Sequence, residues 1–113
     1  MNVQIFGTKK SFDSKKAERY FKERGIKYQF VDMKEKGLSK GEFHSVCKAV
    51  GDYKKLIDPK CKDKNLLALV QYLSEEDKKE KILENQKIIR TPIVRNGKQA
   101  TVGYEPDVWK DWK

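Results

Sequence analysis

The spacing of apolar residues changes along this chain, and each change indicates a different secondary structure. An apolar run at 3–6 precedes helical spacing that begins at Ser14 and ends at Gly25, and residues 26–30 then alternate between apolar and polar. This order predicts a strand, a helix and a second strand. Two parallel strands joined by one helix are expected to cross over with a right hand.

The middle of the chain has helical spacing. Ser39 and Glu42 have the spacing of a capping box, and Gly51 is placed to end the helix that they begin. A charged loop follows at 52–64. Two more helices are expected, one over 66–73 and one that starts at Ser74 with Asp77 in its first turn.

The last third returns to strand spacing. Residues 92–94 and 100–102 are predicted strands, and Asn96-Gly97 between them is typical of a hairpin turn. A final helix is expected from Pro106, packed down by Val108, Trp109 and Trp112. The order of elements predicts a four-stranded mixed sheet with helices on it. At 113 residues the chain is expected to form a single α/β domain over 1–113, with a helical insertion at about 34–88.

The charge pattern limits the partners that the chain can take. The formal net charge is +9, but the lysines are spread over nearly every segment and arginine occurs only four times. Arginine is the residue that contacts phosphates and guanine most specifically, so we expect no direct nucleic-acid binding. Weak attraction to an acidic protein partner remains open. No apolar stretch or signal pattern indicates a membrane, so a cytoplasmic location is expected.

The two cysteines, Cys47 and Cys61, form no C-x-x-C pair, and the single histidine is His44. This composition predicts no metal site and no bound cofactor. Cys47 lies on the apolar face of a predicted helix and is expected in the core. Cys61 stands between two lysines in a polar loop, where a thiolate would be favoured. We expect no disulfide between them.

Three segments carry a family resemblance. They are 5–17 (IFGTKKSFDSKKA), 90–94 (RTPIV) and 102–104 (VGY). In order and spacing they resemble the ArsC/Spx family of arsenate reductase-like proteins, along the whole chain. The resemblance implies a thioredoxin-like (glutaredoxin-like) fold, a helical insertion after the second strand, and a cis peptide bond before Pro92 opposite the active loop.

The chain departs from the family pattern where the chemistry would occur. The resemblance places the reactive cysteine of the family at Ser11 and its resolving position at Ser14. Lys9 replaces a proline of that loop. Thr91 stands where arsenate reductases have arginine, with Arg90 one residue earlier. The nearest match to a second anion-binding arginine is Lys60.

We do not expect a serine at this position to perform the family's reaction. A thiol at a helix N-terminus ionises near neutral pH, whereas a serine hydroxyl needs a general base, and His44 lies in the insertion. The small polar side chain of Ser11 is better interpreted as a helix cap. The free N–H groups of the helix can still bind an oxyanion, close to Lys9, Lys10 and Lys15. The candidate ligand-binding residues are Ser11, Ser14, Lys15, Thr91 and Pro92.

Two functions follow as hypotheses. The first is a redox-inactive ArsC/Spx-like protein that uses its scaffold for binding; Spx-type relatives regulate transcription by contacting RNA polymerase, which makes a transcription component one possible acidic partner. The second is an arsenate reductase-like or glutathione-linked thiol oxidoreductase in which Cys61 supplies the relocated thiol. The missing cysteine at position 11 favours the first.

Overall fold

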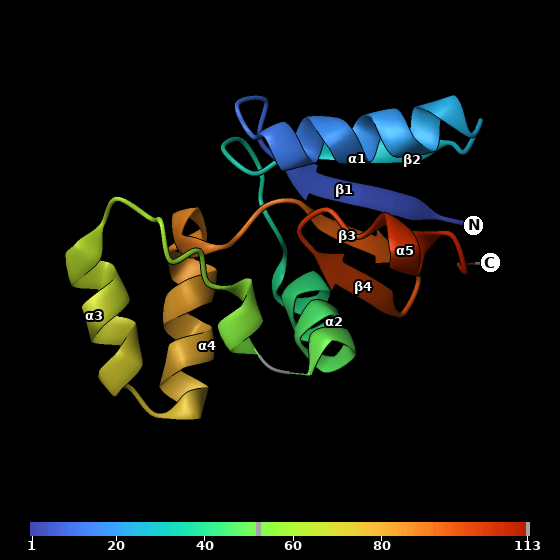
Figure 1. The fold of residues 1–113 in the computed structure, drawn as a ribbon. Coiled ribbons are helices and arrows are strands. Elements are labelled where there is room, and N and C mark those ends of the chain that lie inside the picture. The colour runs from blue at the N-terminus through green and yellow to red at the C-terminus, as the bar shows by residue number, and fades with distance from the viewer. Residues whose placement is uncertain (52, 113) are drawn as a thin grey trace.

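The chain folds around one mixed β-sheet. The computed structural model describes residues 1–51 and 53–112. Four strands form the sheet in the order β2-β1-β3-β4, with β1 and β2 parallel and the other neighbours antiparallel (Figure 1). The predicted mixed sheet is therefore confirmed. The strands are β1 (Val3–Gly7), β2 (Tyr28–Asp32), β3 (Ile93–Asn96) and β4 (Gln99–Val102).

The helices begin and end largely where local sequence signals predict. Ser39 and Glu42 form a complete capping box at the start of α2, and Gly51 ends that helix at a φ of 85°. The Ser74 side chain accepts a hydrogen bond from the backbone N–H of Asp77 at the start of α4. The helices are α1 (Phe12–Glu23), α2 (Lys40–Val50), α3 (Lys64–Tyr72), α4 (Glu75–Glu84) and α5 (Pro106–Trp109), with 3₁₀ turns at Tyr53–Leu56 and Gln86–Ile88. Asp52, at the start of the predicted charged loop, lies outside the described residues.

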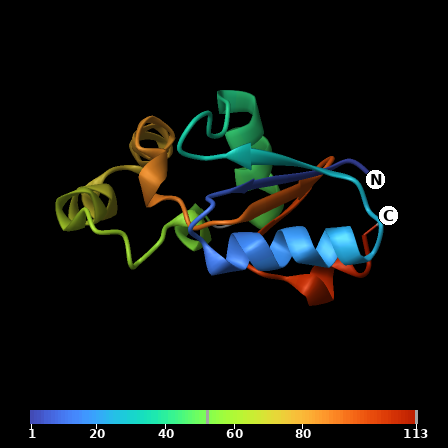
Figure 2. The same cartoon turned by 90° about the horizontal axis from the view of Figure 1, so that it is seen from above.

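Helices α1 and α5 cover one face of the sheet (Figure 2). The indole N–H of Trp109 donates to the Thr101 hydroxyl at 2.8 Å, which ties α5 to β4. Val108 is 44% exposed, so its predicted burial is wrong. Successive residues of a helix point about 100° apart, and once Trp109 faces the sheet its neighbour turns away. The core on this face contains Val3, Ile5, Ala17, Tyr20, Phe21, Val94, Trp109 and Trp112.

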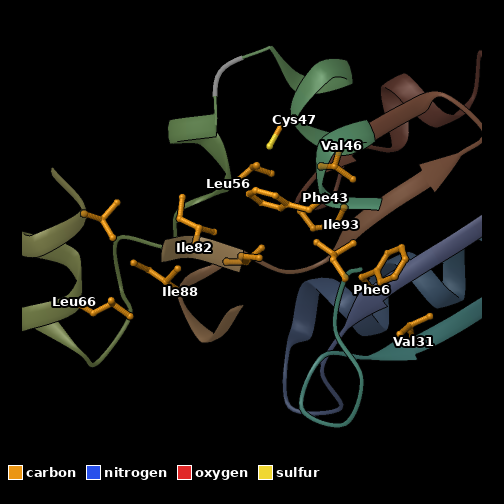
Figure 3. Packing of buried hydrophobic residues seen from close by; sticks show 13 residues of the cluster. Phe6, Val31, Phe43, Val46, Cys47, Leu56, Leu66, Ile82, Ile88 and Ile93 are labelled. Atoms are coloured by element: carbon orange, nitrogen blue, oxygen red, sulfur yellow. The ribbon is translucent and has the colours of Figure 1, made fainter. Parts of the chain in front are cut away.

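A second core joins the other face of the sheet to the helical segment between β2 and β3. Phe6 of β1 and Ile93 of β3 contribute from the sheet, and Phe43, Leu56 and Ile82 contribute from the helices (Figure 3). Helices α3 and α4 lie beside the sheet, not on it, and the molecule is elongated to 43 × 26 × 24 Å (Figure 1). None of the helices in the described residues is long and apolar enough to cross a membrane.

Cys47 belongs to this second core, as the sequence predicts. Its side chain is 9% exposed. Burial raises the pKa of the Cys47 thiol, while the nearby ammonium of Lys79 acts in the opposite direction. Both cysteines are free thiols in the structure. Cys47 is therefore a core residue whose thiol ionises less readily than that of a free cysteine.

Candidate functional site

Ser11 is the N-cap of α1. Its backbone is extended, with φ −81° and ψ 122°, and its hydroxyl accepts a hydrogen bond from the backbone N–H of Ser14 at 3.2 Å. The predicted helix start at Ser14 is wrong, because the helix already includes Phe12 and Asp13. Phe12 is 79% exposed, so it breaks the apolar spacing from which the start was inferred. The interpretation of Ser11 as a cap is confirmed.

Ser14 is buried beneath the loop and does not line an open site. It is 1% exposed, and its hydroxyl accepts a hydrogen bond from the backbone N–H of Thr8 at 3.3 Å. A Cβ on Gly7 would come within 2.8 Å of the Ser14 Cβ, so this close packing requires glycine there. Lys15 is exposed, with its ammonium 6.0 Å from the ring of Phe12. Of the sequence-predicted α1 residues, Ser11 is the one that reaches the cleft described next.

A cleft of about 850 Å³ opens in front of Ser11. Three separate segments form it: the loop before α1, the loop from Asp58 to Asp63, and the chain from Gln86 to Thr91, with a further contribution from Met33 and Lys34. The cleft brings together Ser11, Lys60, Cys61 and Thr91, which are far apart in sequence. We call it the Ser11–Cys61 cleft.

Sequence reasoning missed several residues of this cleft. Lys34, Asp63, Gln86 and Lys87 all line it, although they belong to the predicted insertion or its margins. The sequence carries no local motif for them, because their position depends on how the helical segment docks against the sheet. The one available signal was the concentration of charge in the loop that contains Lys60.

Positive charge predominates in the cleft. Five lysines and two aspartates line it, namely Lys10, Lys34, Lys60, Lys62, Lys87, Asp58 and Asp63. Both carboxylates are already engaged within the protein. Asp63 accepts a hydrogen bond from the backbone N–H of Leu66 and pairs with Lys87 at 3.1 Å, and Asp58 accepts one from the backbone N–H of Lys60. The backbone N–H of Leu66, and after it the side-chain ammonium of Lys87, lower the pKa of the Asp63 carboxyl.

The other cleft lysines are available to a ligand. In the part of the chain that the structure describes, Lys10, Lys34, Lys60 and Lys62 pair with no carboxylate. Four unpaired ammonium groups around one hollow favour an anionic ligand, by an attraction that salt screens.

Cys61 lies in this cleft as a half-buried free thiol. Its sulfur is 3.9 Å from the backbone carbonyl oxygen of Lys87. The cleft therefore holds a thiol, although this thiol comes from the Asp58–Asp63 loop and not from the N-terminus of α1.

Thr91 lines the cleft, whereas Pro92, the other candidate of this segment, does not. The peptide bond between them is cis. Pro92 is buried, and its carbonyl oxygen accepts a hydrogen bond from Gly103 at 2.8 Å. The Arg90 guanidinium lies against Gly103, 3.4 Å from where a Cβ would stand, and Arg90 does not line the cleft. No arginine therefore takes the place of Thr91 as a bidentate anion contact.

His44 is remote from this chemistry. It lines separate hollows beside α2 and α4, one of them with Cys47, and not the Ser11–Cys61 cleft. Within the described residues, no three histidine, cysteine or acidic side chains are grouped to hold a metal ion. Ser11 has no histidine within the cleft to act as its base.

Comparisons with known proteins agree with this architecture. The model of the ArsC family matches residues 6–112. The uncharacterized protein YusI of Bacillus subtilis (strain 168) is 24% identical over 115 residues, which cover 98% of each chain.

Solved structures share the fold. An ArsC family related protein from Bacteroides fragilis superposes with a TM-score of 0.87 at 20% identity, over 100% of this chain and 98% of that one. An arsenate reductase from Vibrio cholerae superposes with a TM-score of 0.82 at 24% identity, over 96% and 94%. At these identities the likeness concerns the thioredoxin-like fold. The family match over nearly the whole chain goes further, and the protein belongs to the ArsC family.

Proposed function

We propose that this protein is a redox-inactive member of the ArsC family that acts in the cytoplasm as a binding protein. Its Ser11–Cys61 cleft binds an oxyanion group, such as a carboxylate or phosphate, presented by an acidic partner. The observation that carries the proposal is the role of Ser11. At the position that the resemblance assigns to the reactive cysteine, the side chain is a helix cap.

The geometry of Ser11 argues against nucleophilic chemistry. Its oxygen accepts the Ser14 N–H, and a serine hydroxyl stays protonated at neutral pH without a base to remove its proton. The acidic groups that line the cleft are engaged elsewhere: Asp63 caps α3 and pairs with Lys87, and Asp58 accepts a hydrogen bond from the Lys60 N–H. A carboxylate with a lowered pKa is a weak proton acceptor.

The same geometry supports anion binding. At the N-terminus of α1 the N–H of Ser14 is bound by the Ser11 hydroxyl and that of Lys15 by the Ser11 carbonyl oxygen. The N–H groups of Phe12 and Asp13 remain as donors there, where the helix dipole favours negative charge. The unpaired lysines of the cleft add attraction. Thr91 in place of arginine removes a bidentate contact, so the affinity for a small anion should be low.

The alternative function is a thiol oxidoreductase that uses Cys61. The observation that favours it is the presence of this thiol in the same cleft as Ser11 and Thr91. In that case Cys61→Ser would abolish an activity that Ser11→Ala leaves intact. The binding proposal expects no activity in either protein.

An NMR titration of the full chain tests the binding proposal. Phosphate and sulfate should shift the backbone amides from Ser11 to Lys15 with a dissociation constant of about 1 mM, or about 4 kcal/mol. The shifts should fade as sodium chloride is added. If those amides stay still while others move, the cleft is a solvated surface and the proposal fails.

A matched pair of variants locates the site. Lys60→Gln should weaken phosphate binding severalfold, because it removes an unpaired charge from the cleft. Lys98→Gln removes the same charge from the exposed β3–β4 turn and should leave the dissociation constant nearly unchanged. Equal weakening by both variants would mean that the anion responds to net charge and not to the cleft.

A further inference from the structure

A second groove lies between α1 and the segment that leads into α5. Its volume is about 390 Å³. Arg24 follows Ser11 by 13 residues, so the far end of this groove is roughly 20 Å along the helix from the N-cap at 1.5 Å per residue. The groove is lined by Lys16, Arg19, Tyr20, Glu23, Arg24 and Tyr104. We call it the α1–α5 groove.

One wall of the groove is a guanidinium held on an aromatic ring. The Arg24 guanidinium carbon lies 3.7 Å from the centroid of the Tyr20 ring, and its Nη1 donates to the Tyr20 carbonyl oxygen at 3.1 Å. The two contacts fix the plane of the guanidinium. They engage one N–H, and its remaining donors are left for a ligand.

The opposite wall repeats this arrangement. The Lys16 ammonium lies 5.6 Å from the centroid of the Tyr104 ring. Both tyrosine rings pack edge-on against Trp109, at 5.2 Å for Tyr20 and 5.5 Å for Tyr104. Trp109 is 2% exposed and is fixed by its hydrogen bond to Thr101. The groove is therefore built on a rigid aromatic base.

The cations of the groove lack acidic partners. Across residues 1–51 and 53–112, Lys16, Arg19 and Arg24 pair with no carboxylate, although Glu23 lines the same groove. Two of the four arginines of the chain meet here. A planar guanidinium matches a carboxylate through two parallel hydrogen bonds, which a lysine coat does not offer.

We propose that the α1–α5 groove is a docking surface for a short acidic segment of a partner protein. Carboxylates of the segment pair with Arg19 and Arg24, and an aromatic or aliphatic side chain between them packs on Tyr104. Tyr104 lines the groove and is 39% exposed. The inference does not rest on the Ser11–Cys61 cleft, because the two surfaces share no lining residue.

The chemistry of the surroundings favours a peptide over a nucleic-acid strand. Glu23 is within the groove, and the exposed carboxylates of Glu105 and Asp107 flank it in sequence next to Tyr104 and Pro106. A continuous phosphate backbone would meet these negative charges at close spacing. A peptide can place a neutral apolar side chain there instead. A groove of this volume holds one or two side chains, which suits a short segment.

The experiment uses the full-length protein and the acetylated peptide EEYEEL, with QQYQQL as the uncharged control. NMR should show shifts concentrated at Arg19, Arg24, Tyr104 and the indole N–H of Trp109 with EEYEEL, and none with QQYQQL. Phosphate, by contrast, should act on the Ser11–Cys61 cleft in wild type and in every groove variant. The two ligands therefore test the two surfaces separately: loss of peptide binding concerns the groove, and loss of phosphate binding concerns the cleft.

Two double variants decide between docking and general attraction. Arg19→Gln with Arg24→Gln should weaken EEYEEL binding about tenfold. Lys22→Gln with Lys27→Gln removes the same charge from exposed positions that do not line the groove and should weaken EEYEEL binding less than about twofold. The double variant could unfold because it removes the contact of Arg24 with the Tyr20 ring. The single variant Arg19→Gln, at an exposed position, then replaces it in the test. It should still weaken peptide binding about threefold.

Three results would overturn the inference. Equal weakening by the two double variants would show that net charge alone attracts the peptide. Binding of a dT6 oligonucleotide, or of vesicles containing phosphatidylserine, more tightly than EEYEEL would assign the groove to a different partner. Peptide shifts confined to the Ser11–Cys61 cleft would leave the groove without a ligand.

Discussion

The side-chain amide of Gln86 pairs with both backbone groups of Leu38. Its Oε1 accepts from the Leu38 N–H at 2.7 Å, and its Nε2 donates to the Leu38 carbonyl oxygen at 2.7 Å and to that of Leu83 at 3.2 Å. The pairing joins the segment after α4 to the loop before α2, across 48 residues of sequence. A Cβ on Gly37 would collide with this side chain, and Gly37 has a φ of +71°.

Replacing Gln86 should destabilise the fold. Leu38 is 4% exposed, so Gln86→Ala leaves a buried N–H and a buried carbonyl without partners. The free energy of unfolding should fall by about 2–4 kcal/mol, as measured by urea denaturation. The control Gln71→Ala removes an exposed glutamine of α3, and it should change the free energy of unfolding by less than about 0.5 kcal/mol. Similar small effects of both variants would show that solvent replaces the Gln86 pairing.

The Asp63 cap should make stability depend on acid pH. The pKa of Asp63 is lowered below its ordinary value of 3.8 by the Leu66 N–H and by Lys87. A carboxyl whose native pKa is lower than its unfolded pKa stabilises the fold above the unfolded value, and this contribution is lost as pH falls through the native pKa. Asp63→Asn should therefore be less stable than wild type near neutral pH, and the difference should shrink in strong acid.

Urea midpoints of wild type and Asp63→Asn, measured from about pH 7 down to about pH 2, test this dependence. Asp111→Asn, at an exposed position near the end of the chain, serves as the control and should track wild type throughout. If the difference in urea midpoint between wild type and Asp63→Asn stays constant or widens in acid, the charge of Asp63 does not contribute to stability.

The two thiols should react at different rates and remain separate. Cys61 is half-buried in an open cleft, whereas Cys47 is 9% exposed with a pKa raised by burial. A chromogenic disulfide reagent should modify Cys61 first and Cys47 much more slowly, with the assignment made by Cys61→Ser. After mild peroxide, two free thiols should remain under denaturing conditions. A quantitative intramolecular bridge would contradict the separation of the two sites.

A cysteine placed at the cap should gain the reactivity that Ser11 lacks. In Ser11→Cys, with Cys47 and Cys61 replaced by serine, the new thiolate would accept the Ser14 N–H at the N-terminus of α1. Its pKa should fall below about 7.5. The ultraviolet absorbance of the thiolate across pH gives this value directly. A pKa at or above about 8.5 would show that this helix terminus does not activate a thiol.

Local sequence signals predicted much of the fold. The capping box at Ser39, the N-cap at Ser74 and the Asn96-Gly97 turn work through contacts within a few residues, so they can be inferred from spacing alone. The start of α1 was misplaced because the exposed ring of Phe12 does not follow the apolar pattern. The burial of Val108 was wrongly predicted because a one-turn helix buries only one of its sides, and in α5 that side carries Trp109.

The candidate site depended on long-range contacts, and much of it could not be predicted. The sequence identified Ser11, Thr91 and Cys61 as residues of interest through the resemblance and the flanking lysines. The participation of Gln86 and Lys87 follows from how α4 docks, which no local motif encodes. The α1–α5 groove likewise depends on tertiary packing, since Tyr20 and Tyr104 meet only around Trp109.

The central claim is that this ArsC-family protein binds through its cleft and does not reduce arsenate. The decisive measurement is arsenate reduction by the purified full-length chain, with glutathione and glutaredoxin as donor in one assay and thioredoxin in the other. We expect turnover equal to that of a control without protein, because position 11 offers a capped hydroxyl where the reaction needs a thiolate. Turnover above that control, abolished by Cys61→Ser, would contradict the claim and assign the protein a thiol chemistry centred on Cys61.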